Sequence, residues 1–73
     1  MMTIEDLINQ VVRDIRSIEE YAKNKSYDER VSLDNRKYGF VCTLGRLLLG
    51  VAGKDISNTD HATRAARDYL TSH

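Results

Sequence analysis

Apolar residues recur at alternating steps of four and three along the first third of the chain. The set consists of Ile4, Ile8, Val11, Ile15, Ile18 and Ala22, with Leu7 and Val12 at its flanks. At about 100° per residue it covers a face roughly 140° wide, and polar residues fill the rest of the circle. Thr3 precedes this face, and Glu5 and Asp6 follow in the first turn, as expected of a capped helix N-terminus. The pattern predicts an amphipathic helix of about 22 residues.

A break at "KNKSYDER" separates this helix from a second one. Ser26 with Glu29 three residues later has the capping-box pattern, which would start a helix at Tyr27 and carry it to Ala52. The segment "SLDN" offers a second possible start, near Ser32 or Asp34, after a short separate turn. Apolar residues from both halves fall on one side of a single helical wheel, and this favours the continuous helix.

The segment "KYGFVCTLGRLLLGVAGK", residues 37–54, is the most apolar part of the chain. On a helical wheel its apolar residues span an arc of about 220°, much wider than a surface helix needs. The remaining strip holds Gly39, Thr43, Arg46 and Gly50. Gly53 then fits the position just past a helix end, where a left-handed conformation is favourable for glycine. The segment predicts a buried central helix.

Two other interpretations of this segment fail on elementary grounds. The sixteen residues between Lys37 and Lys54 would span about 24 Å as a helix, against a hydrocarbon core of about 30 Å. Arg46 at their centre adds a further cost to membrane insertion. The stretch "GRLLLGVA" has two glycines at the spacing of a phosphate-binding loop but lacks the Lys-Ser/Thr pair that such a loop requires. We therefore expect neither a membrane span nor a nucleotide site.

The end of the chain predicts a short third helix over residues 58–71. Ser57, Asn58 and Thr59 are alternative caps for its N-terminus. A narrow apolar stripe at three-four spacing then consists of Ala62, Ala65, Ala66, Tyr69 and Leu70. Arg64 and Arg67 lie on the opposite side. Because the stripe is mostly alanine, the helix can approach its neighbour more closely than leucine would allow.

Together these elements predict an all-α fold: one small three-helix domain over residues 1–73, with a long amphipathic helix, a buried central helix and a short C-terminal helix. The absence of proline lets the helices run without kinks. The single cysteine rules out an internal disulfide framework and fits a reducing compartment. The N-terminus lacks the pattern of a secretory signal, so we expect a cytoplasmic protein.

The width of the apolar arc on the central helix predicts self-association. One long narrow stripe and one short alanine face are insufficient to cover it within a lone chain, and small domains often complete their cores as oligomers. We expect a symmetric homodimer. The predicted self-association residues are Tyr38, Leu44, Leu47, Leu48 and Val51. The alternative is a compact three-helix monomer with some exposed leucine.

No constellation of residues indicates catalysis or metal binding. Cys42 lies within the apolar helix, where an inert buried thiol is expected. His61 falls in the first turn of a helix, and neither it nor His73 has a ligand-like companion at helical spacing. No third residue that would orient a Cys-His pair is apparent. The sequence predicts a non-enzyme without cofactor or metal.

Eleven basic and eleven acidic residues leave the chain without net charge, which disfavours nucleic acid or an anionic membrane as partner. The expected function is that of a small non-catalytic accessory or regulatory protein that binds another, unidentified protein. The alternative is a small DNA-binding regulator that uses Arg64 and Arg67 on the outer face of its last helix, with Lys54 before them. Asp60 and Asp68 lie among these cations and weaken that alternative.

Overall fold

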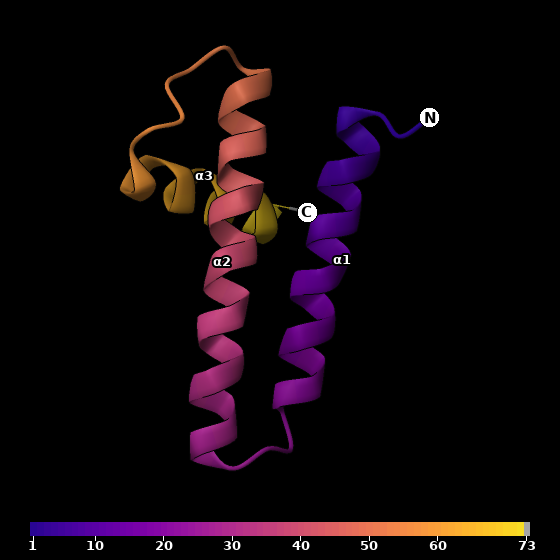
Figure 1. The fold of residues 1–73 in the computed structure, drawn as a ribbon, viewed down its shortest axis with the longest axis vertical. Helices are drawn as coiled ribbons and strands as arrows, with labels where there is room; N and C mark the ends of the chain where they lie inside the picture. Colours follow the sequence, from indigo (N-terminus) through magenta and orange to yellow (C-terminus); the bar gives the residue numbers. More distant parts are fainter. Residues whose placement is uncertain (73) are drawn as a thin grey trace.

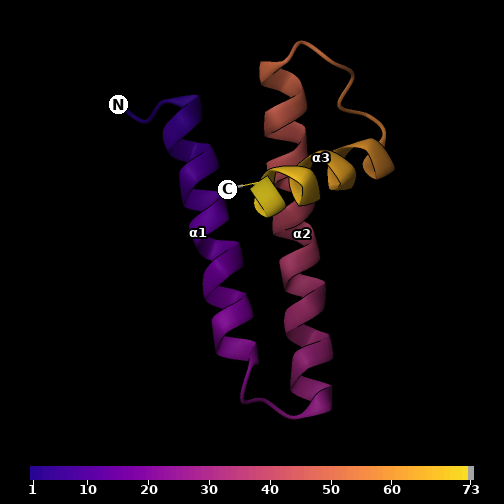
Figure 2. The same cartoon turned by 180° about the vertical axis from the view of Figure 1, so that it is seen from behind.

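A computed structural model describes residues 1–72 of the chain. This part forms three α-helices and no strand: α1 (Ile4–Ala22), α2 (Tyr27–Val51) and α3 (Thr59–Ser72). The predicted all-α, three-helix fold is confirmed. α1 and α2 form an antiparallel hairpin, and α3 crosses α2 in the C-terminal half of that helix (Figure 1). α3 lies behind the hairpin in Figure 1 and in front of it in the reversed view of Figure 2, so it covers one face of the hairpin only.

The N-terminus of α1 is held by a capping box. The Thr3 hydroxyl accepts a hydrogen bond from the Asp6 amide at 3.1 Å, and the Asp6 carboxylate accepts one from the Thr3 amide at 3.2 Å. These two bonds satisfy backbone donors that have no partner within the helix. The predicted start of this helix is confirmed, and with 19 residues it is slightly shorter than the predicted length of about 22.

The first of the two predicted starts of α2 is correct. The Ser26 hydroxyl accepts a hydrogen bond from the Glu29 amide at 3.4 Å, and α2 then continues unbroken from Tyr27. At its other end Gly53 adopts the predicted left-handed conformation, with φ of 72°. The Lys54 amide there donates to the Leu49 carbonyl at 2.9 Å, which closes the helix end.

α3 is capped by Asn58, one of the three predicted candidates. Its side-chain oxygen accepts a hydrogen bond from the His61 amide at 3.0 Å. Ser57 is not the cap, because its amide and hydroxyl both donate to the Asp55 carboxylate, at 2.9 and 3.0 Å. Asp55 and Ser57 thus shape the connector between α2 and α3, and the helix begins after it.

The core lies where the three helices meet. It consists of Ile8, Val11 and Ile15 from α1, Val41 and Leu44 from α2, and Ala66 from α3. Ile15 and Leu44 are completely shielded from solvent. Full burial of such a side chain stabilises a fold by about 1.5–3 kcal/mol, so the α1–α2 contact at these two residues anchors the hairpin.

Small residues form the contact between α2 and α3. A methyl group on Gly45 would overlap the backbone carbonyl of Ala62, so the two helices touch through their main chains at this point. Ala62 and Ala66 are both fully buried there. The predicted alanine stripe is confirmed, and the glycine that it requires on the facing helix is Gly45.

The predicted burial of the central helix holds only for its middle. Val41, Cys42, Leu44 and Gly45 are buried. The three consecutive leucines at 47–49 are half-buried, Tyr38 is 48 % exposed and Val51 is 64 % exposed. The reason is geometric: α3 is short and crosses α2, while α1 lies along one side of it (Figures 1 and 2).

Candidate interaction surfaces

The five predicted self-association residues do not share one surface. Leu44 is fully buried in the core. Tyr38 is seven residues from Gly45, which places it within about 20° of the side that contacts α3. Leu47 is nine residues from Tyr38, and therefore about 180° away, on the opposite side of α2. Val51 lies on Leu47's side, and Leu48 lies about 40° from Leu44, on the side of α2 that faces α1 and the core.

The side of the hairpin that α3 leaves open carries a row of apolar residues. On α2 these residues recur at steps of seven and four. On α1 the residues of the row are identified from the direction of Arg16, whose side chain reaches α3. Arg16 lies about 100° to one side of the core residue Ile15, so residues on the other side of Ile15 face away from α3. We call this row the uncovered face, and it consists of Leu7, Ile18, Leu33, Phe40, Leu47 and Val51.

Every residue of the uncovered face is partly or largely accessible to solvent. Phe40 and Leu47 pack against the core with one side and present the other outward. Ile4, at the start of α1, adds a further exposed apolar side chain. Figure 1 views the hairpin from this side, and no helix lies over it. The result is an apolar seam along two helices that no part of residues 1–72 covers.

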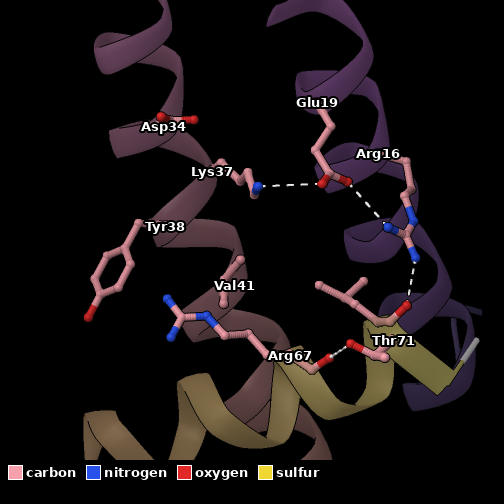
Figure 3. A pocket seen from close by; sticks show the side chains of 9 residues that line it. Arg16, Glu19, Asp34, Lys37, Tyr38, Val41, Arg67 and Thr71 are labelled. Carbon is pink, nitrogen blue, oxygen red and sulfur yellow. Dashed lines mark hydrogen bonds and ion pairs between the residues drawn. The ribbon is translucent and has the colours of Figure 1, made fainter. Parts of the chain in front are cut away.

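A polar groove of about 640 Å³ lies on the other side of the molecule, where the three helices meet. Each helix contributes to its walls: Arg16 and Glu19 from α1, Lys37 and Tyr38 from α2, Arg67 and Leu70 from α3. We call it the polar groove (Figure 3).

Side-chain contacts across the polar groove tie the helices together. The Arg16 guanidinium donates to the Leu70 carbonyl at 2.8 Å and to the Glu19 carboxylate at 3.3 Å. The second oxygen of Glu19 accepts from the Lys37 ammonium at 3.4 Å. Figure 3 shows these contacts as one chain that runs from α2 through α1 to the end of α3. Arg16 also neutralises a carbonyl at the negative end of the α3 dipole.

Arg67 and Tyr38 occupy the other part of the groove. Figure 3 shows the Arg67 side chain extending from α3 toward Tyr38. The pKa of the Tyr38 hydroxyl is raised above its usual value, first by a hydrogen bond with the Cys42 thiol and then by the charge interaction with that thiol, while Arg67 acts in the opposite direction. The phenol therefore stays protonated at neutral pH. Within residues 1–72, Arg67 forms no ion pair.

Cys42 and His61 lie in different surroundings. Cys42 is buried and unpaired, and His61 is exposed at the start of α3. His73 lies outside the described residues. Among residues 1–72, no three His, Cys, Asp or Glu side chains are grouped so as to hold a metal ion. In the same part of the chain no helix has the length and apolar character needed to cross a membrane.

The sequence analysis did not identify either the uncovered face or the polar groove as a single surface. The uncovered face had a signal, since Leu33, Phe40 and Leu47 are spaced by seven residues. The polar groove had none, because it joins side chains from three separate helices.

Comparison of the chain with protein-family models, with curated proteins and with solved structures finds no match. The functional inference therefore rests on the geometry of these two surfaces.

Proposed function

We propose that the protein is a small non-catalytic accessory or regulatory protein that acts by protein–protein interaction, and that it works as a homodimer joined through the uncovered face. One observation carries the proposal: α3 covers a single side of the α1–α2 hairpin, and the opposite side carries the apolar seam. A row of apolar residues rimmed by polar ones is typical of an interaction site.

The uncovered faces of two copies of the chain can pack against each other. Packed face to face about a twofold axis, two hairpins would form a four-helix arrangement in which each seam lies in the interior. The seven-residue spacing of Leu33, Phe40 and Leu47 suits the nearly aligned helix packing of such bundles. A standard interface buries about 800 Å² per partner, roughly a seventh of this chain's 5332 Å². The length of two neighbouring helices is sufficient for an interface of this size.

Size-exclusion chromatography coupled to light scattering tests the proposal. The wild-type chain should run at twice its 8.3 kDa mass at micromolar concentration. Val51→Glu should shift the mass to one chain without unfolding, because Val51 is mostly exposed in the single chain and its charge would be buried only in the dimer. Leu47→Glu should do the same or unfold the chain, since Leu47 also touches the core.

The matched control is Asn35→Glu, which adds the same charge to an exposed position of α2 about 120° from Leu47. Circular dichroism would verify that each variant keeps its helices. A wild-type mass of 8.3 kDa throughout the micromolar range would contradict the homodimer.

The proposal assigns the protein to the cytoplasm. A lone thiol such as Cys42 stays reduced there, and no pairing with a second cysteine is possible within the chain. Burial of Cys42 fits a structural thiol better than a reactive one.

The DNA-binding alternative gains no support from the geometry. Arg64 and Arg67 line a shared hollow with Asp60 and Asp68, so the acids offset the cations where a phosphate would have to lie. The connector between α2 and α3 spans residues 52–58, longer than the tight turn of a helix-turn-helix.

A further inference from the structure

We infer that the polar groove binds a carboxylate-bearing peptide segment of a partner protein, in which an acidic side chain pairs with Arg67. The inference names the kind of partner for the interaction protein proposed above. The groove and the uncovered face lie on opposite sides of α2, so each can be tested without the other.

Charge is distributed unequally within the groove. The Glu19 carboxylate engages Arg16 and Lys37 with its two oxygens, and Arg16 also binds the Leu70 carbonyl. These groups are committed to joining the helices. Arg67 projects into the same space and forms no ion pair within residues 1–72. Arg67 also borders the hollow that contains Asp60 and Asp68, but neither carboxylate forms an ion pair with it, so its guanidinium is the cation best placed to take a charge from outside.

The charge balance selects the class of anion. Three cations and two acids line the groove, the second acid being Asp34 at its far end, so the lining has a net charge of one positive unit. A single carboxylate matches this charge. A phosphate, with nearly two negative charges, would need further cations and would be repelled by Asp34.

The groove is lined in a way that favours a peptide over a free ion. Val41 and Leu70 line it beside Arg67 and provide apolar contact for neighbouring side chains of a ligand. Its walls are held in place by the Arg16 and Lys37 contacts, so little ordering is needed on binding. Arg67 lies three residues before Leu70 on the same helix, and the bond from Arg16 therefore fixes the backbone that carries it.

Nuclear magnetic resonance titration of the full chain tests the inference. The probe is a blocked pentapeptide, Ser-Leu-Glu-Leu-Ser, and the reference peptide has glutamine in place of glutamate. The acidic peptide should move the amide signals of Tyr38 and Arg67 in a saturable way, and the neutral peptide should not. Arg67→Gln should weaken binding about tenfold, as expected when one partner of a charge pair is lost. Tyr38→Phe removes only a hydroxyl that already bonds Cys42, and it should weaken binding by less.

Arg64→Gln is the matched control, because it removes the same charge from α3 at an exposed position outside the polar groove. It should change the affinity by less than twofold. Equal losses for both arginine variants, equal binding of the neutral peptide, or the absence of a saturable shift would each overturn the inference. Arg67→Gln should also keep the mass of the wild type in light scattering, so failure of the groove and failure of the homodimer are separate results.

Discussion

α2 makes two contacts of opposite character. Toward α1 it presents Val41 and Leu44, which pack against branched side chains such as Ile15. Toward α3 it presents Gly45, whose main chain touches that of Ala62. The first contact gains stability from the apolar area of large side chains. The second gains it from close approach of two backbones, which only small residues permit.

The two contacts should differ in what they tolerate. A contact between large side chains can lose a methylene group and relax around the gap, because neighbouring side chains have rotatable bonds. A contact between main chains cannot accommodate an added carbon, because the two helices would have to move apart as rigid bodies. The comparison therefore predicts that adding one carbon on the α3 side costs more than removing one on the α1 side.

Gly45→Ala should have the largest effect. Alanine favours a helix interior over glycine by about 1 kcal/mol, yet the added methyl group meets the Ala62 carbonyl. We expect the free energy of unfolding to fall by about 3 kcal/mol in a urea titration. Gly39→Ala is the control on the same helix, since nothing lies within 4 Å of a methyl group there. It should raise the stability by about 0.5–1 kcal/mol, and the same rise at Gly45 would show that the backbone contact is absent.

Ala66→Leu should follow, with a loss of about 2 kcal/mol, because Ala66 is fully buried against the hairpin and leucine would overpack it. Here the contact is with side chains, which can give way in part. Arg64→Ala on the exposed side of α3 should change the stability by no more than about 0.5 kcal/mol. If Ala66→Leu and Arg64→Ala changed the free energy of unfolding equally, in thermal and in urea unfolding, α3 would not bury the side that carries Ala66.

Ile15→Val should have the smallest effect of the three substitutions at helix contacts, a loss of about 1 kcal/mol. It removes a single methylene group from a fully buried side chain in the α1–α2 contact. Chemical denaturation of this variant alongside Gly45→Ala measures the contrast directly. A loss at Ile15 that matched or exceeded the loss at Gly45 would reverse the proposed order of tolerance.

Local signals in the sequence were sufficient for the helices. The caps at Thr3 and Ser26 and the left-handed Gly53 are each set by neighbours within four residues, so a single sequence shows them. The alanine stripe likewise identified the buried side of α3. The choice of Asn58 over Ser57 as cap depended on Asp55, which binds Ser57 within the connector.

The arrangement of the helices was not predictable in the same way. Gly45 and Ala62 come together only because α3 crosses α2 at that height, and nothing within one turn of either residue encodes the crossing. Thr63 is buried for the same reason, with its hydroxyl satisfied by the Asp60 carbonyl at 3.1 Å. A helical wheel drawn for α2 alone also places Tyr38 and Leu47 in one apolar arc. In the structure Tyr38 lies near the side that contacts α3, and Leu47 lies on the opposite side.

The bond from Arg16 to the Leu70 carbonyl joins positions 54 residues apart. The α1–α2 hairpin, in contrast, closes over a turn of a few residues, so its loop-closure entropy is much smaller. The bond from α1 to the end of α3 can therefore form only after both short connectors, residues 23–26 and 52–58, have closed. During synthesis from the N-terminus, the hairpin is complete before α3 has emerged. A nascent chain of this protein thus passes through an interval in which both sides of the hairpin are open, and in a crowded polysome the docking of α3 sets when that interval ends.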